Sequence, residues 1–278
     1  MMFRFGLKPD DGRHPRKSFA DMRARLSGSP QGGADLTEHA GPVLDQNNVG
    51  WCTVNTLMAA ATTLKAAGTP LGFIPSQRVA YQLALRLDRA DDYPLRAVAD
   101  MPRLRDVGSQ LLTMVEVGNR YGVCPMGPTV KVDGYTRMSD CSPANATDDA
   151  ALSLADVETS ATRLLVGAYE LDNYTTRKTD MMMALDGKHS LSIGGFVDTV
   201  TYMWYRPGSS PIGAQVLSDP NGGGHCTELL GYKFEGSSRL WKIKGSWSEE
   251  WGHDGYGWVT DAFVDQLWAV FCMSVEVR

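Results

Sequence analysis

The amino-acid sequence predicts an α+β fold of two lobes, in which a helical N-terminal lobe is followed by an antiparallel β C-terminal lobe. Apolar residues recur at helical spacing in the first half of the chain. Short strand-like segments, separated by turn residues, make up the second half. The length of 278 residues, with 43% hydrophobic and 21% charged residues, is that of an ordinary globular protein with a sizeable core.

The helical half is expected to begin after an extended N-terminal arm, residues 1–38, which contains at most a short helix near Phe19–Leu26. A first helix starts at Cys52 and is ended by Gly68, and Ser76 is a suitable N-cap for a second helix. The expected helices span residues 52–67, 79–87 and about 107–120.

The periodicity changes after a stretch rich in Ser, Thr, Asp and Ala at about residues 138–160, which we interpret as a loop or insertion. Strands are expected at residues 163–171, 191–197, 214–218, 225–234, 239–244 and 255–260, with a short helix at 179–185. Residues 39–278 therefore form one domain behind the arm. It divides into a helical lobe at about 46–137, the insertion, and a β lobe at about 161–278.

Charge and cysteine content argue against several classes of function. A net charge of −5 without a basic stripe disfavours nucleic-acid binding, and no apolar run reaches the roughly 18 residues of a membrane span. The N-terminus lacks the apolar segment of a secretory signal, so we expect a cytoplasmic protein or one incorporated in an assembly such as a virion. The five scattered cysteines form neither a disulfide framework nor a zinc pattern, and we expect no metal or other cofactor.

Cys52 is distinguished by its place at the start of a helix. Unpaired N–H groups and the helix dipole stabilise a thiolate there, so the thiol is a candidate nucleophile that needs a base. Three of the five histidines lie in polar or turn-rich segments and are expected to be solvated: His14, His39 and His253. His189 is a weak candidate. His225 follows three glycines and opens a strand, whose alternation turns Cys226 to the opposite face.

Three segments resemble, in family order, the signatures of papain-like cysteine peptidases. They are DQNNVGWC at residues 45–52, GGGHCTELLGY at 222–232 and LWKIKGSWSEEWGHDGYGWV at 240–259. YGVCPMGP at 121–128 and GWVTDAFV at 257–264 also resemble the bacterial branch of this family, which lacks the long inhibitory propeptide. The resemblance runs from about residue 35 to the C-terminus. It implies the two-lobe papain-like fold with an active-site cleft between the lobes.

The resemblance also implies roles for individual residues. Cys52 becomes the nucleophile, and His225 becomes the general base and later the acid. Gln46 becomes the side-chain donor of the oxyanion hole beside the Cys52 N–H, and Trp247 matches the tryptophan that shields the histidine from water. The substrate would be a peptide or protein, and the helix end and imidazolium would lower the thiol pKa. About 38 preceding residues are too few for the family's long helical inhibitory segment, so we do not expect a zymogen of that type.

The sequence departs from the family pattern at the catalytic asparagine, where Gly245 stands instead. Glycine has no side chain to accept the imidazole N–H, so activity is expected to be reduced, and Gly245→Asn is expected to raise it. Trp51 replaces the small residue before the nucleophile, and Val49 replaces a cysteine of a structural disulfide. The separation of Cys52 from His225 exceeds the usual ~130–150 residues, which the insertion explains.

Three functions are compatible with these residues. The first is a cysteine-type peptidase that hydrolyses peptide bonds through a Cys52 thiolate and His225. The second, favoured by Gly245 and Trp51, is a weakened or inactive papain-like domain that serves as a structural or binding component of a larger assembly such as a phage particle. The third is a cell-wall peptide hydrolase that uses the same two residues.

Overall fold

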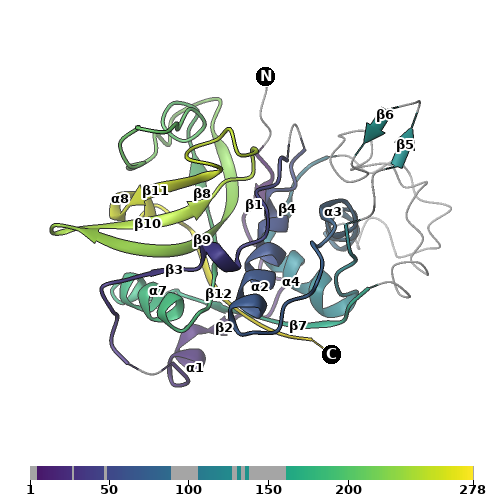
Figure 1. The fold of residues 1–278 in the computed structure, drawn as a ribbon, viewed down its shortest axis with the longest axis horizontal. Helices are drawn as coiled ribbons and strands as arrows, with labels where there is room; N and C mark the ends of the chain where they lie inside the picture. The colour runs from purple at the N-terminus through teal and green to yellow at the C-terminus, as the bar shows by residue number, and fades with distance from the viewer. Residues whose placement is uncertain are drawn as a thin grey trace.

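The structure is a computed structural model that describes residues 5–26, 28–46, 49–88, 106–126, 130–132, 135–137 and 161–277. The helices at residues 55–66, 77–87 and 111–120 lie on one side of the molecule, and most strands of a large sheet lie on the other side together with the helices at 177–186 and 261–264 (Figure 1). The predicted α+β, two-lobe architecture is therefore confirmed. The predicted insertion at about 138–160 lies outside the described residues.

The helices of the N-terminal lobe follow the predicted order. They are α2 (Asn55–Ala66), α3 (Gln77–Leu87) and α4 (Leu111–Arg120), and a 3₁₀ turn, η2 (Cys52–Val54), leads into α2. The Ser76 side chain accepts a hydrogen bond from the N–H of Val79 at 3.2 Å, so the predicted N-cap is confirmed. The third helix begins at Leu111 rather than 107, because residues 109–110 form a strand.

The large sheet has the strand order β11-β10-β9-β8-β12-β7-β2. Its later strands are β7 (Leu164–Glu170), β8 (Leu191–Val197), β9 (Gly223–Glu235), β10 (Ser238–Lys244), β11 (Tyr256–Thr260) and β12 (Ala269–Val277). Neighbouring strands among these six are antiparallel, as predicted. Two further helices are α7 (Arg177–Asp186) and α8 (Asp261–Val264), and β5 (Val130–Val132) pairs with β6 (Tyr135–Arg137) in a separate sheet.

Two strand predictions differ from the structure. Residues 214–218 form no strand, because Val216 and Leu217 are exposed in a loop between β8 and β9 and their apolar character does not mark burial. The central strand β12 was not predicted. It lies between β7 and β8 and is buried over its first half.

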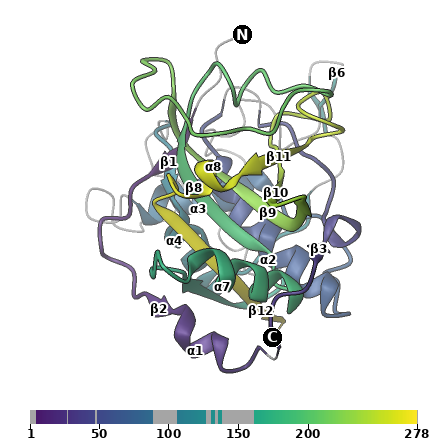
Figure 2. The ribbon, with the colours of Figure 1, turned by 90° about the vertical axis from the view of Figure 1, so that its left-hand side faces the viewer.

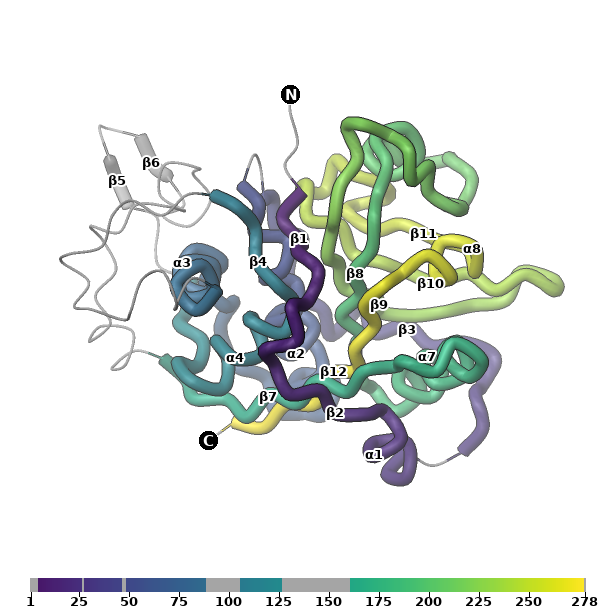
Figure 3. Tube along the Cα trace, turned by 180° about the vertical axis from the view of Figure 1, so that it is seen from behind, coloured from purple at the N-terminus to yellow at the C-terminus, as the bar shows by residue number. Residues whose placement is uncertain are grey.

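The N-terminal arm is an integral part of both lobes. It forms β1 (Leu7–Lys8), β2 (Lys17–Ser18), α1 (Phe19–Arg23) and β3 (Gly33–Asp35), followed by the 3₁₀ turn η1 (Thr37–His39). β1 pairs with β4 (Ser109–Gln110) of the helical lobe, whereas β2 and β3 pair with β7 and β9 of the sheet. Seen from behind, the arm descends between the two lobes (Figure 3).

Two apolar clusters form the core, and the arm contributes to both. Leu7 belongs to the cluster around α2, α3 and α4, whereas Phe19 and Met22 belong to the cluster around the sheet and α7. α1 and α7 lie together at one end of the molecule (Figure 2). Helix α2 packs on β8, β9 and β12, so the helix that follows Cys52 rests directly on the sheet that carries His225. No described helix combines the length and apolar character that a membrane span requires.

Candidate active site

The loop before Cys52 is hydrogen-bonded to the segment that directly follows β10, two hundred residues later in the chain. Asp45 and Trp247 form an antiparallel bridge, and the Gln46 N–H donates to the Ser246 carbonyl oxygen at 2.7 Å. The Ser246 hydroxyl donates to Gln46 Oε1 at 2.5 Å. The first and third sequence signatures therefore meet in space.

Cys52 lies against the strand that begins with the second signature. Its sulfur accepts hydrogen bonds from the backbone N–H groups of Cys226 and Gly6. Asn55, one turn further along, donates its side-chain N–H to the Cys226 carbonyl oxygen at 3.1 Å. The thiol thus touches the main chain of the residue that follows His225.

His225 is buried, 2% exposed, and its ring stacks on Trp247 with centroids 4.8 Å apart and an interplanar angle of 18°. Trp247 therefore lies where a shield for the imidazole would lie. Neither imidazole nitrogen has a hydrogen-bond partner among the described residues. In this conformation the Cys52 sulfur is accordingly not hydrogen-bonded to His225.

Burial makes both groups of the candidate dyad neutral. It raises the pKa of Cys52 to about 12, with a further electrostatic contribution from Cys226, and lowers the pKa of His225 to about 3. Backbone hydrogen bonds to the sulfur act in the opposite direction but are outweighed. The expectation of a lowered thiol pKa is therefore wrong for this conformation, because desolvation exceeds the effect of the helix end.

Gln46 is also buried, and its amide is held from two sides. Nε2 donates to the Val49 carbonyl oxygen at 3.2 Å, and Oε1 accepts from Ser246. The amide is thereby oriented within the segment that leads to Cys52. This places a rigid N–H donor in the loop that precedes Cys52.

The arm covers this site with residues 5–8, which we call the cleft segment. The Gly6 N–H donates to the Cys52 sulfur, and the Gly6 carbonyl oxygen accepts from the Ser109 N–H at 2.7 Å. The Phe5 ring contacts His225 edge-on, with centroids 6.1 Å apart. A short extended segment thus covers the thiol. The arm is therefore part of this site.

Glycines on both sides make room for the cleft segment. A Cβ at Gly6 would lie 1.7 Å from the Gly50 carbonyl oxygen, and one at Gly224 would lie 2.3 Å from the Leu7 carbonyl oxygen. Contacts this short are incompatible with any side chain. The glycine run before His225 therefore forms a wall along which the cleft segment passes.

The space at Gly245 is filled by another residue. A Cβ at this position would lie 2.4 Å from Cε3 of Trp251, whose ring is buried. The ring cannot rotate away cheaply, because its Nε1 donates to the Tyr202 carbonyl oxygen at 2.9 Å. The expectation that Gly245→Asn would raise activity does not fit this packing.

The other histidines lie apart from Cys52. His253 is exposed, as predicted, and His39 is half-buried. His189 bonds to the Met273 carbonyl oxygen at 2.9 Å. His14 was expected to be solvated, but its Nε2 lies 3.1 Å from the Thr113 hydroxyl and its Nδ1 lies 3.3 Å from a Glu116 oxygen.

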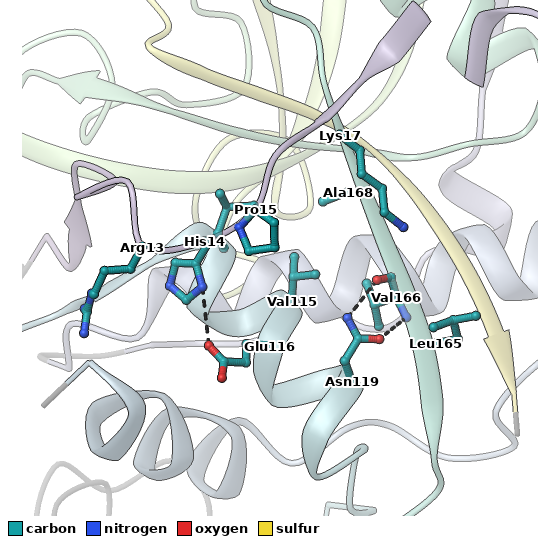
Figure 4. A pocket seen from close by; sticks show the side chains of 11 residues that line it. Arg13, His14, Pro15, Lys17, Val115, Glu116, Asn119, Leu165, Val166 and Ala168 are labelled. Atoms are coloured by element: carbon teal, nitrogen blue, oxygen red, sulfur yellow. Dashed lines mark hydrogen bonds and ion pairs between the residues drawn. The ribbon is translucent and has the colours of Figure 1, made fainter. Parts of the chain in front are cut away.

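His14 lines a pocket of about 410 Å³ between the arm, α4 and β7 (Figure 4). The His14–Glu116 pair lies on one side of this pocket. On the other, the Asn119 amide bonds to both the N–H and the carbonyl of Val166, at 2.7 and 2.9 Å. None of the candidate catalytic residues lines this pocket, which is therefore distinct from the site at Cys52.

Comparisons with known proteins identify the fold. The chain superposes on xylellain, a cysteine protease from Xylella fastidiosa, with a TM-score of 0.67 and 19% identity over 99% of this chain and 95% of that one. Procathepsin L 3 of Tenebrio molitor gives a TM-score of 0.60 and 16% identity over 98% and 75%. The bromelain protease of Ananas comosus, in complex with the E64 inhibitor, gives 0.58 and 14% over 88% and 100%.

The fold is therefore that of the papain-like cysteine proteases. A sequence profile described as papain family cysteine protease matches residues 135–265, a range that includes His225 and Trp247 but not Gln46 or Cys52. The resemblance to this family predicted from the sequence is confirmed. A search of curated protein sequences gave no significant match. The fold and the partial profile match together support a cysteine peptidase in general terms.

Proposed function

We propose that the protein is a cysteine peptidase in which Cys52 is the nucleophile and His225 the base, and that the cleft segment holds it closed. The main support is the contact between the Cys52 sulfur and the main chain beside His225. Nucleophile and base come from segments far apart in the chain. Hydrolysis of a peptide requires that such a nucleophile and base meet at one point, and the main-chain contact brings the two segments together.

The proposed reaction begins when a substrate replaces the cleft segment. The thiol proton passes to the neutral His225 imidazole, and sulfur bonds to the carbonyl carbon of the peptide. The developing oxyanion accepts hydrogen bonds from the Cys52 N–H and Gln46 Nε2. The C–N bond then breaks, and the amine leaves with the proton from His225. Water, deprotonated by His225, attacks the thioester, releases the carboxylic acid and returns the thiol.

The closed conformation suppresses the first of these steps. With the pKa of Cys52 at about 12, almost no thiolate exists at neutral pH. The sulfur that must attack also accepts a hydrogen bond from the Gly6 N–H. Departure of the cleft segment would hydrate both groups, and their pKa values would move back towards the ordinary values of about 8.5 and 6.5.

A peptidyl epoxide tests the proposal, because it alkylates an activated thiol and leaves a stable adduct. Wild-type protein, Cys52→Ser and His225→Gln would each be incubated with the probe, and adducts located by peptide mass spectrometry. We expect an adduct on Cys52 that forms at least 100-fold more slowly in His225→Gln, since general bases contribute about 10²–10⁴-fold. Iodoacetamide is a far less specific reagent for thiols than the epoxide. Its rate of reaction with Cys124 serves as the control for folding.

The second candidate function, a scaffold without activity, is favoured by the packing of Trp251 into the place of the family's asparagine. It predicts that the probe reacts with Cys52 no faster in wild type than in His225→Gln. That outcome, with Cys124 labelling unchanged, would overturn the peptidase proposal.

A further inference from the structure

The loss of a side chain at residue 245 leaves open which group orients the imidazole of His225. Tyr202, in the turn after β8, is fully buried and contacts this ring, with centroids 5.6 Å apart and planes inclined at 69°. It lies at the same distance, 5.6 Å, from Trp247. Because His225 and Trp247 are stacked, equal distances place Tyr202 beside the stack rather than above it. Tyr202 therefore lies beside the edge of the imidazole rather than on its face.

The backbone of Tyr202 is rigidly held. The buried Asp198 carboxylate accepts hydrogen bonds from the N–H groups of Val200 and Thr201, at 3.0 and 2.6 Å, and so fixes the turn. The Tyr202 carbonyl oxygen accepts from Nε1 of Trp251. Trp251 is also the residue that fills the space at Gly245. Trp251 thus both fills the space of the missing asparagine side chain and holds the backbone of Tyr202 in place.

The polar atoms of this pair are unsatisfied. The Tyr202 hydroxyl oxygen and both nitrogens of His225 are buried and have no hydrogen-bond partner among the described residues. Buried polar groups are nearly always paired, so each such atom calls for an explanation. Three unpaired polar atoms in two contacting side chains indicate that these side chains form a hydrogen bond in another conformation. In the closed conformation, Phe5 lies against the imidazole and this bond is not made.

The surroundings of the hydroxyl support the same conclusion. Burial raises the pKa of Tyr202, the Thr227 hydroxyl lowers it, and Cys52 raises it further. The hydroxyl is therefore close to Thr227 and within electrostatic range of the nucleophile. The Thr227 hydroxyl donates to the Lys244 carbonyl oxygen, so its own oxygen is free to accept from a tyrosine.

We propose that Tyr202 is the positioning residue of His225 and takes the place of the family's catalytic asparagine, an inference that rests on the proposed function. Its hydroxyl oxygen accepts the N–H of the imidazole, and its proton is donated to Thr227. The other imidazole nitrogen then carries the lone pair that receives the Cys52 proton. When the imidazole becomes protonated, the same hydroxyl oxygen stabilises the charge, as the third residue of a triad does.

Tyr202→Phe tests this inference, because it removes one oxygen and keeps the ring packing. Tyr205→Phe is the matched control. Tyr205 is also buried and contacts Trp251 at 5.6 Å, but its hydroxyl accepts from the Trp258 N–H at 3.3 Å. Two quantities would be measured on full-length protein: the imidazole ¹⁵N chemical shifts of His225, which report its tautomer, and the pH dependence of epoxide alkylation at Cys52.

In Tyr202→Phe we expect a changed tautomer ratio of His225, a shifted acidic limb of the pH profile and an alkylation rate at least tenfold lower. Tyr205→Phe should resemble wild type in all three. Wild-type values in Tyr202→Phe, with Cys52 still reactive, would overturn the positioning role and leave the proposed function intact. An unreactive Cys52 in wild type would instead count against the proposed function, and the ¹⁵N shifts would still decide whether Tyr202 contacts His225.

Discussion

While the cleft segment covers Cys52, there is no space for a methyl group at residue 6. The substitution Gly6→Ala therefore tests whether this segment holds the site closed. In Gly6→Ala the new Cβ would lie 1.7 Å from the carbonyl oxygen and 2.2 Å from the carbonyl carbon of Gly50. Both are backbone atoms, which cannot rotate away as a side chain would. The segment must therefore shift away from the Cys52 sulfur.

The expected effect follows from the cost of overpacking. Inserting a methyl group into a well-packed site costs about 1–3 kcal/mol. Since 1.36 kcal/mol corresponds to a factor of ten in an equilibrium constant, the open population should rise roughly 5- to 150-fold. The stability of the rest of the fold should decrease less, because only the cleft segment needs to move.

The assay is alkylation of full-length protein by iodoacetamide at pH 8, with each cysteine quantified by mass spectrometry. If opening precedes reaction, the rate at Cys52 should increase by the same factor as the open population. Gly32→Ala is the matched control, since it lies in the same arm and an added Cβ meets nothing within 4 Å. Cys272, which is buried against Met22 in the other core cluster, reports global unfolding.

The result that would refute the reasoning is a wild-type rate at Cys52 in Gly6→Ala. A parallel rise at Cys52 and Cys272 would also refute it, because it would show loss of the whole fold rather than release of the cleft segment. A rise confined to Cys52 is the expected outcome.

Two further predictions concern Gly245 and pH. Gly245→Asn should lower the free energy of unfolding by about 1–3 kcal/mol in urea denaturation and give no gain in peptide cleavage, because Trp251 fills the space; faster cleavage at unchanged stability would contradict this. His225 has a pKa of about 3 in the fold, against about 6.5 when unfolded, so the unfolded chain binds the extra proton at mildly acidic pH. As the pH is lowered from 6.5 to 5, the free energy of unfolding should therefore decrease by up to about 1.4 kcal/mol per pH unit. This slope, measured by Tm, should shrink in His225→Gln, and an identical slope there would exclude His225 as its source.

Local sequence signals predicted those elements whose residues are buried on one consistent face. The strand at residues 191–197 was placed to the residue, and the Ser76 cap identified the start of α3. The strand expected at 214–218 failed because its apolar side chains face solvent. Strand β12 was missed because burial in the middle of a sheet depends on neighbours from distant parts of the chain.

The candidate site shows the same division. Gln46, Cys52 and His225 could be named from short motifs, since each motif combines a chemical group with a local backbone signal. Tyr202 had no such signal, because it lies in a turn outside every motif and meets His225 only through the packing around Trp251. The cleft segment was likewise unrecognised, because an extended polar arm carries no pattern that says what it covers.

By itself, the sequence determined the two-lobe class, the order of most elements and the candidates for nucleophile and base, because these follow from periodicity and from chemistry carried by single side chains. Only the tertiary structure decided that the thiol and imidazole are both neutral, that Gly6 lies on the sulfur and that Trp251 occupies the space at Gly245. Desolvation and close packing are sums over atoms brought together from distant positions in the chain, and no local pattern encodes them.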